Sequence, residues 1–339
     1  MPRPVPTIQI VGGGPAGSMA ALAGIREGAS VRIFEKSAFP RHKVCGEFLS
    51  PAIATVLRRA GCETDFLELG PAVLREMHLH FGGRVVRHRL PEPAYGLSRY
   101  ELDRLLLQRA VDAGAELFRE RWTAVAQSDP AIVAAGRKSI APPTSDRLFG
   151  FKAHFSGPVN DAVELYFFDN CYAGVSAIEN GATNVCGLAS EQTLRSHGFH
   201  PDDLLKRCAP LSERVRPLTR TMDWLVTGPL VFSERISQQQ DVSSQPGGQV
   251  TYRAGDALGF IDPFTGSGIL NAILTGELAG LAAAQGKPTG EYLRECRRLL
   301  RRPFLVSGAM RAILASGHAG LLAPLVPGRV LFYATRPAG

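Results

Sequence analysis

Three glycines, Gly12, Gly14 and Gly17, have the spacing of a dinucleotide-binding turn between a strand pattern and a helix pattern. In such a turn the first glycine allows the tight bend, the second lets the backbone approach a diphosphate, and the third lets the helix pack closely on the strand. The helix would begin at Pro15 and Ala16, and partial positive charge at its N-terminus favours phosphate groups. The spacing therefore predicts a dinucleotide site, with a tight turn that binds no ligand as the alternative.

An acidic residue, Glu35, ends the next strand pattern 23 residues after Gly12. A carboxylate at this position can accept hydrogen bonds from a ribose diol and repels a 2′-phosphate. We place the neighbouring Lys36 at the same site. The sequence therefore favours an adenine dinucleotide with free ribose hydroxyls over NADP.

A second glycine-rich segment, Arg253 to Ala279, contains the pair Gly255-Asp256 and continues into a helix pattern. Asp256 alone would be interpreted as a helix cap or a turn acid. Because the first glycine turn occurs in the same chain, we favour a role for Asp256 in the same ligand site.

Cysteines and histidines show no metal-ligand spacing. The six cysteines are irregularly spaced with no Cys-x-x-Cys pair, which argues against a zinc knuckle or a disulfide framework and indicates a reducing cytoplasm. His78 and His80 would share one face of a strand, but no third ligand has a fitting spacing, so we expect no metal site and a structural role for both. Glu164, Tyr166 and Tyr172 are candidate polar groups for a substrate, and the sequence does not distinguish them from residues on a sheet surface.

Composition indicates a globular protein of about two domains, because 45% of the 339 residues are hydrophobic and 20% are charged. The net charge of +7 favours anionic ligands, phosphates or an acidic membrane surface. Most basic residues are scattered, so we expect no nucleic-acid partner. One cluster could contact anionic lipid headgroups, although a solvated helix face is the favoured interpretation: Arg297, Arg298, Arg301 and Arg302. No signal peptide and no membrane span is expected, so we predict a cytoplasmic protein with peripheral membrane contact as an option.

The motifs require elements of both helix and strand type. Residues 7–36 have the strand, turn, helix and strand pattern of a βαβ unit, and helices are expected at 51–60 and 268–284. The pair Gly82-Gly83 predicts a hairpin turn, and Ser98 with Glu101 predicts a capping box at a helix start.

Alternating residues between Phe151 and Leu188 predict an antiparallel sheet. We therefore predict an α/β fold (α+β overall), with a Rossmann-like domain built from discontinuous segments, an inserted, mostly antiparallel β domain and C-terminal helices. The expected divisions are 1–74, 97–146 and 250–289 for the dinucleotide domain, 75–96 and 147–249 for the substrate domain, and 290–339 for the helical region.

The segment from Arg253 to Ala279 resembles the carboxy-terminal flavin motif of FAD-dependent oxidoreductases with the para-hydroxybenzoate hydroxylase fold, especially the geranylgeranyl reductase-like branch. The resemblance implies that Gly255 and Asp256 hold the ribityl hydroxyls of FAD. It also implies backbone contacts to the isoalloxazine ring, where a glycine-lined helix N-terminus would stabilise an anionic reduced flavin. The residues that would make these contacts are Asp262, Pro263, Thr265, Gly266, Ser267, Gly268 and Ile269.

Three further stretches extend the resemblance. Pro40 to Pro51 is similar to the Lys-x-Cys-Gly segment of that branch, which implies that Arg41, Cys45 and Gly46 lie beside the flavin. A helix start resembling Arg-x-x-Leu implies that Arg99 touches the diphosphate or ribose. The turn at Gly136 resembles the one that closes the FAD site.

The chain also departs from the family. Only nine residues separate Arg121 from Ala131, where a longer β-meander is usual, and this puts FAD affinity in doubt. The Trp-x-Trp-x-Ile-Pro signature of tryptophan halogenases is absent, which makes halogenation a weaker hypothesis. The aromatic stretch of prenyl reductases is also absent, and residues 170–181 occupy its position.

The resemblance implies an FAD-dependent oxidoreductase that reduces a carbon–carbon double bond of a hydrophobic prenyl, polyketide or lipid-like substrate with hydride from reduced flavin. The electron donor is not determined by the sequence; NAD(P)H, if used, would dock transiently, because only one dinucleotide fingerprint is present. Aromatic monooxygenation and a catalytically idle flavin-binding protein are the alternatives. Cys45 is the one candidate near the reaction, no proton donor can be assigned, and the oligomeric state is not determined by the sequence.

Overall fold

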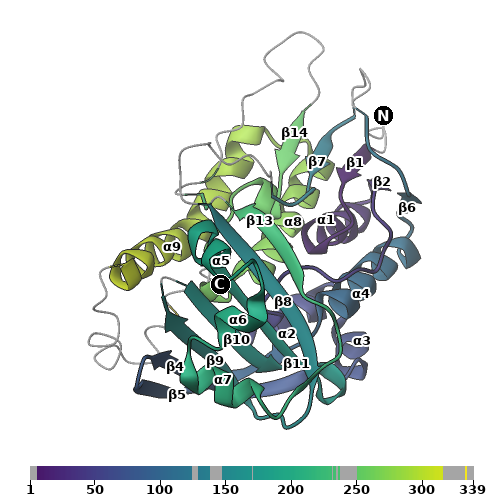
Figure 1. Ribbon diagram of the computed structural model, residues 1–339. Coiled ribbons are helices and arrows are strands. Elements are labelled where there is room, and N and C mark those ends of the chain that lie inside the picture. Colours follow the sequence, from purple (N-terminus) through teal and green to yellow (C-terminus); the bar gives the residue numbers. More distant parts are fainter. Residues whose placement is uncertain are drawn as a thin grey trace, which may run out of the picture.

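The computed structural model describes residues 6–123, 129–137, 147–169, 171–230, 232–233, 236, 250–315 and 333, with the backbone only at 314 and 315. Within these residues the chain forms two sheets with helices packed on them (Figure 1). One sheet is parallel and the other is mostly antiparallel, so the predicted fold class is confirmed.

The parallel sheet has the strand order β14-β7-β1-β2-β6. Its strands come from four separate parts of the sequence, namely β1 (Thr7–Val11) and β2 (Ser30–Phe34), β6 (Glu116–Phe118), β7 (Ala131–Val133) and β14 (Thr251–Arg253). The predicted βαβ unit is confirmed, because β1 and β2 are parallel and α1 (Pro15–Arg26) connects them.

Two helices pack against each other beside this sheet, α1 and α8 (Gly268–Gln285). Glycines allow the close contact: a Cβ atom at Gly276 would lie 2.1 Å from the Ala16 carbonyl oxygen, and one at Gly280 would lie 2.2 Å from the Ala20 carbonyl oxygen. Helix α1, which follows the first glycine turn, therefore packs directly against helix α8, which lies in the second glycine-rich segment.

The second sheet has the order β12-β8-β11-β10-β9-β4-β5-β3, with β13 also paired to β8. All its pairs are antiparallel except β4 with β9. Its strands are β3 (Phe48–Leu49), β4 (Ala72–Phe81), β5 (Arg84–Gly96), β8 (Leu148–Ser156), β9 (Ala162–Phe168), β10 (Cys171–Ala177), β11 (Thr183–Ser190), β12 (Thr219–Arg220) and β13 (Leu225–Leu230). The predicted hairpin is present between β4 and β5, and the predicted antiparallel run is present in β8 to β11.

The remaining elements connect or cover the sheets. They are α2 (Ala52–Arg59), α3 (Glu63–Glu68), α4 (Arg99–Asp112), α5 (Glu191–Ser196), α6 (Pro201–Leu205), α7 (Ala209–Val215), α9 (Thr289–Ala315) and short 3₁₀ turns η1 (Glu179–Gly181), η3 (Gly255–Ala257) and η4 (Pro263–Thr265). Within the described part of the chain, no helix is both long enough and apolar enough to cross a membrane.

The capping box predicted at Ser98 and Glu101 is half correct. The Ser98 hydroxyl accepts a hydrogen bond from the Glu101 amide at 3.2 Å. The Ser98 amide, however, donates to Glu179 at 2.8 Å, and the Glu101 carboxylate pairs with Arg104. The reciprocal bond is absent because a buried carboxylate from η1 takes the donor.

The three-part domain division stays a prediction. Its edges at 138–146 and 237–249 lie outside the described residues, as does part of the shortened 121–131 segment. The antiparallel sheet begins with β3 and with Ala72 of β4, both within the range expected for the dinucleotide domain.

Candidate functional site

The three glycines of the first turn serve different purposes. A Cβ atom at Gly12, whose φ is +104°, would lie 2.6 Å from the Ala134 carbonyl oxygen, and one at Gly17 would lie 1.8 Å from the Gly12 carbonyl oxygen. Close packing therefore requires both. Gly14 has an ordinary φ of −76°, and the atom nearest to a Cβ atom added there would be Lys43 Nζ at 3.6 Å. The space above Gly14 is a cradle that a side chain would fill, which fits a diphosphate.

The start of α1 is suited to an anion. Its N-cap, Gly14, has no side-chain hydrogen bond, and its first turn contains no acidic residue. The partial positive charge of the helix N-terminus and the Lys43 ammonium group therefore act on the same space.

A buried cation cluster adjoins this turn. Asp103 is fully buried and binds Lys43 Nζ at 2.7 Å and Arg99 Nε at 2.7 Å. Burial alone would raise the pKa of Asp103, but Arg99 and Lys43 outweigh it and hold that pKa below its usual range. Two cations share one carboxylate, so the cluster has a surplus positive charge that a diphosphate would balance.

Glu35 is oriented by the glycine turn. Its Oε2 accepts a hydrogen bond from the Gly13 amide at 2.9 Å, and its Oε1 accepts one from the Ser37 amide at 2.9 Å. The carboxylate retains further lone pairs for a ribose diol. The neighbouring Lys36 is exposed.

The two distant glycine motifs meet. Gly255 has a φ of +60°, its amide donates to Thr275 Oγ1 at 2.9 Å, and a Cβ atom there would lie 3.0 Å from the Ala16 Cβ. The adjacent Asp256 makes no hydrogen bond with the residues that the structure describes. Burial raises the pKa of Asp256 above its usual range, although Arg137, Arg99 and Lys43 act in the opposite direction. The carboxylate is thus placed near three cations, with its acceptor atoms available to ribityl hydroxyls.

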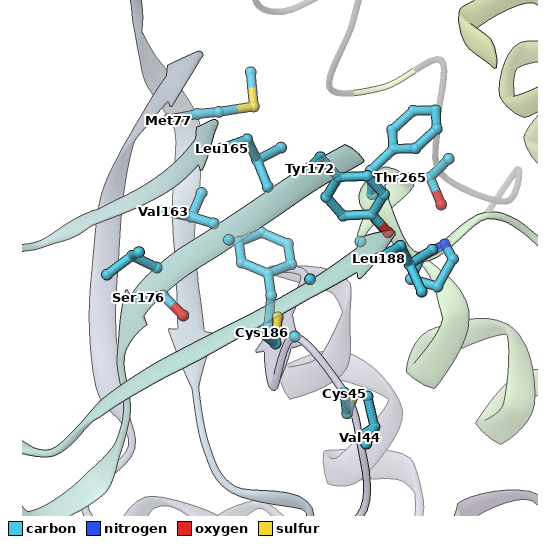
Figure 2. A pocket seen from close by; sticks show the side chains of 18 of the residues that line it. Val44, Cys45, Met77, Val163, Leu165, Tyr172, Ser176, Cys186, Leu188 and Thr265 are labelled. Carbon is cyan, nitrogen blue, oxygen red and sulfur yellow. The ribbon is translucent and has the colours of Figure 1, made fainter. Parts of the chain in front are cut away.

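A cavity opens between these motifs and the antiparallel sheet (Figure 2). It encloses about 840 Å³, including its open mouth. One wall is formed by the predicted residues Cys45, Gly46, Pro263 and Gly266. The remaining walls are mainly apolar and include Val44, Phe48, Met77, Val163, Leu165 and Leu188.

Comparison with known proteins gives the same cofactor. Residues 5–144 match a protein family described as an FAD binding domain. A menaquinone reductase from Mycobacterium tuberculosis is 27% identical over 320 residues, covering 80% of this chain and 75% of that protein. The chain is an FAD-dependent oxidoreductase.

Solved structures identify the fold of this oxidoreductase. A flavin-dependent brominase superposes with a TM-score of 0.78 at 17% identity, over 97% of this chain and 92% of the other. A geranylgeranyl bacteriochlorophyll reductase-like protein from Thermoplasma acidophilum superposes with a TM-score of 0.68 at 19% identity, over 98% and 92%. At these sequence identities the similarity shows the para-hydroxybenzoate hydroxylase-like fold alone. That halogenation is a less favoured activity for this chain therefore stays a prediction.

A tyrosine and a carboxyl group form a polar corner of the cavity in this oxidoreductase. Tyr172 lines the cavity, and its hydroxyl lies 3.5 Å from Asp262 Oδ1. Burial raises the pKa of Asp262 to about 6, opposed by the Phe264 amide and by Arg311, whose Nε lies 3.8 Å from Asp262 Oδ2. The resemblance implied backbone contacts from the Asp262-Pro263 pair, but it did not indicate a role for the Asp262 carboxyl group.

A buried ion network holds the loop that carries Cys45. Glu47 is fully buried with a φ of +55°, and its carboxylate binds Lys152, His154 Nε2 at 2.7 Å and the Arg99 amide at 2.7 Å. Burial would raise the pKa of Glu47, but His154 and Lys152 lower it overall. The network was not predicted, because Lys152 and His154 lie 105 and 107 residues from Glu47 in sequence, and Arg99 lies 52 residues from it.

The other predicted residues vary in their proximity to this site. Arg41 is exposed on the loop before Lys43, and Gly136 has a φ of +75° beside Arg137, which lines the cavity. Gly268 is exposed at the start of α8. Ser267 and Ile269 are buried. Lys43 and Arg137 were missed, although both lie inside stretches that resemble the family.

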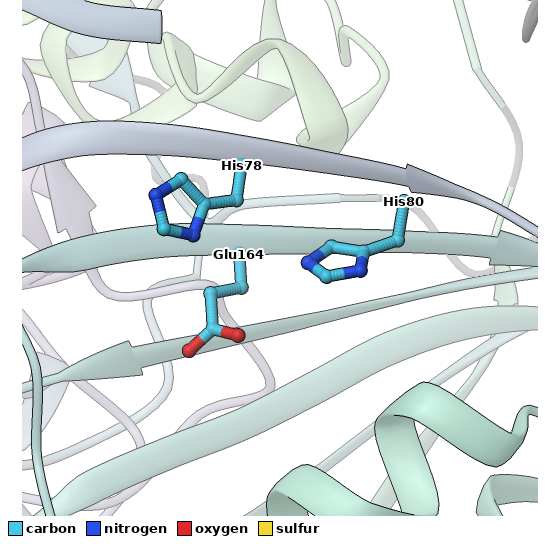
Figure 3. Close-up of side chains that lie close together, drawn as sticks. All are labelled: His78, His80 and Glu164. Atoms are coloured by element: carbon cyan, nitrogen blue, oxygen red, sulfur yellow. The ribbon is translucent and has the colours of Figure 1, made fainter. Parts of the chain in front are cut away.

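Sequence spacing offers no third ligand beside His78 and His80, but the structure brings one close, and the absence of a metal site stays a prediction. Glu164 lies on the adjacent strand β9, and the ligand atoms of the three residues are all within 4.8 Å of one another (Figure 3). Sequence spacing does not reveal this group, because β4 and β9 become neighbours only through the order of strands in the sheet.

Proposed function

We propose that this oxidoreductase reduces a carbon–carbon double bond in a hydrophobic prenyl, polyketide or lipid-like substrate. The observation that carries the proposal is the apolar cavity, which adjoins both Cys45 and the Pro263–Gly266 segment. Cavities of this kind, with few polar groups among many apolar ones, suit the binding of an apolar small molecule.

The names of similar proteins support this substrate class. The Mycobacterium tuberculosis relative is named a menaquinone reductase, and the Thermoplasma acidophilum structure is described as geranylgeranyl bacteriochlorophyll reductase-like. Both names describe reduction.

The proposed holding groups for FAD are those brought together by the two motifs. The Gly14 cradle, Lys43 and Arg99 would bind the diphosphate, Glu35 a ribose, and Asp256 the ribityl chain. FAD, once reduced, supplies hydride, and NAD(P)H docking transiently is our proposed source of electrons. The protein's part is to orient the substrate in the cavity and to exclude water from it.

We further propose that Tyr172 donates the proton that completes the reduction. Hydride adds to one carbon of the double bond, the Tyr172 hydroxyl gives its proton to the other carbon, and Asp262 returns a proton to Tyr172. Burial raises the pKa of Tyr172, so its hydroxyl is protonated when the substrate binds. Asp262 in turn takes up a proton from solvent, while Arg311, whose Nε lies 3.8 Å from its Oδ2, stays charged and relays no proton.

Anaerobic turnover tests the reductase proposal. Purified holoenzyme with NAD(P)H and a polyprenyl alcohol should, without oxygen, give a product in which one double bond is reduced, followed by mass spectrometry as a gain of two hydrogens. Turnover that requires oxygen and adds an oxygen atom would instead establish a monooxygenase. Reduced flavin that no such substrate reoxidises would establish an idle flavoprotein.

The proton donor is tested by Tyr172→Phe. We expect turnover to fall by about 10²-fold or more, because general acid catalysis contributes that much, with FAD content unchanged. Turnover by the wild type should be slower in D₂O than in H₂O, a solvent deuterium isotope effect. Unchanged turnover in Tyr172→Phe would show that another group donates the proton.

A further inference from the structure

A second cluster lies on the opposite face of the antiparallel sheet from the apolar cavity. Successive side chains of a strand alternate between faces, so Met77, Val163 and Leu165 point to the cavity while His78, His80 and Glu164 point away from it. Figure 3 shows the side chains of His78 and His80 on β4 close to that of Glu164 on β9. The parallel register pairs His78 with Glu164 and His80 with Tyr166.

His80 is in an unusual environment for a histidine. Its ring stacks on Tyr166 with centroids 4.1 Å apart, and both ring nitrogens are buried without a hydrogen-bond partner among the described residues. A buried polar atom without a partner is costly, and such an atom calls for an explanation. Burial lowers the pKa of His80, so the ring is neutral at pH 7 and a nitrogen lone pair is available.

Glu164 is ionised and held in a fixed orientation. Its Oε2 accepts from the Tyr166 hydroxyl at 2.5 Å, and its Oε1 accepts from Arg214 Nε at 2.7 Å and Asn160 Nδ2 at 2.9 Å. Burial would raise the pKa of Glu164, but these hydrogen bonds keep it below its usual range. Each carboxylate oxygen has two lone pairs, so Oε2 can still bind a cation beside the tyrosine.

His78 adds the remaining group at the edge of the cluster. Its Nε2 lies 2.7 Å from Glu76 Oε2 on the same strand. A carboxylate bound to one ring nitrogen orients an imidazole and makes it a better metal ligand.

We propose that His78, His80 and Glu164 form a binding site for one divalent transition-metal ion such as Zn²⁺. Two imidazoles and one carboxylate are a ligand set that zinc accepts, with water as the fourth ligand. The ion gives a buried His80 nitrogen its missing partner and ties β4 to β9, the one parallel pair of this sheet. Arg214 is repelled by the ion, so the affinity is lower than that of a four-ligand structural site.

Zinc titration of the FAD-loaded protein, after treatment with a chelator, tests the site. Calorimetry should show one equivalent of Zn²⁺ bound, and the ion should raise the thermal midpoint. Cobalt(II) should give visible absorption at longer wavelength than the flavin bands. A wild-type protein that binds no zinc would overturn the proposal.

Three variants locate the ion. His80→Phe retains a ring to stack on Tyr166, Glu164→Gln retains the shape of the side chain, and His78→Ala changes a side chain at the edge of the cluster. Each should weaken zinc binding by at least about tenfold. The control is His88→Phe on β5, which removes a histidine whose Nε2 is also buried without a partner but which lies outside the cluster.

Flavin absorbance and circular dichroism establish that each variant is folded. Zinc binding that survives in every folded cluster variant, or is lost in His88→Phe, would contradict the assignment. The readouts do not involve turnover, so they stand apart from the proposed reductase activity.

Discussion

At the scale of single residues, the glycines of the first turn separate packing from ligand binding. Gly17 has no room for a Cβ atom, whereas Gly14 has room and an ordinary φ. Their substitutions should therefore fail in different ways.

We expect FAD-free Gly14→Ala to unfold at the same thermal midpoint as the FAD-free wild type. The variant should bind FAD about tenfold more weakly, a loss of about 1.4 kcal/mol in binding free energy. The added methyl group fills the cradle above the helix N-terminus. Flavin fluorescence titration measures the affinity. Gly17→Ala is the contrasting variant and should lower the midpoint of the FAD-free protein. Equal FAD affinity in Gly14→Ala and wild type would show that the space above Gly14 does not hold the diphosphate.

Asp262 should reduce stability at neutral pH. Its folded pKa of about 6 lies above the ordinary value of 3.8, so the folded state binds the proton more tightly, and this contribution to stability is lost as pH rises toward 6. Asp262→Asn removes the buried charge and should stabilise the protein by about 1–3 kcal/mol at pH 8. Urea unfolding at several pH values should show a gain that grows between pH 4 and pH 7 and then levels off. A gain independent of pH would contradict this explanation.

At the scale of elements, the contact between α1 and α8 joins the two motifs. Small residues bring the helices together, and this contact places Gly255 against Ala16. The geometry of the FAD site therefore depends on helix packing as well as on the glycine turns.

Gly280→Ala should destabilise the protein by about 1–3 kcal/mol and also weaken FAD binding, because its Cβ atom would lie 2.2 Å from the Ala20 carbonyl oxygen. Gly308→Ala is the matched control in α9, where an added Cβ atom would have no neighbour within 4 Å. It should stabilise by about 0.5–1 kcal/mol, because alanine favours the helix over glycine. Denaturant unfolding with and without FAD distinguishes the two. Similar midpoints for both variants would show that the helix contact is not tight.

At the scale of the whole molecule, the two sheets contribute to different binding sites. The parallel sheet carries the glycine turn and Glu35, while the antiparallel sheet supplies most of the apolar wall of the cavity. Cofactor binding and substrate binding should therefore be separable by substitution.

Leu165→Trp on β9 tests this division, because the larger side chain would fill the cavity from the wall formed by the antiparallel sheet. We expect the FAD content and the flavin spectrum to match the wild type, while turnover of a long prenyl substrate falls by about tenfold or more. Val226→Trp, at an exposed position of β13, is the control. If Leu165→Trp lost FAD while Val226→Trp kept it, cofactor binding and substrate binding would not be separable by substitution.

Local patterns predicted much of this protein. The strand, glycine turn and helix at Gly12 to Gly17, the hairpin at Gly82 and the helix cap at Ser98 depend on residues a few positions apart, so their chemistry is visible in the order of the chain. The resemblance of the second motif to a flavin motif then indicated FAD. These features follow from short-range sterics and hydrogen bonding.

Only the tertiary structure decided which distant groups meet. Lys43 and Asp103 are 60 positions apart, and Tyr172 and Asp262 are 90 positions apart. His78 reaches Glu164 because β4 and β9 are neighbouring strands. Such contacts depend on strand order and helix packing, which arise from burial of the whole chain rather than from the spacing of any segment.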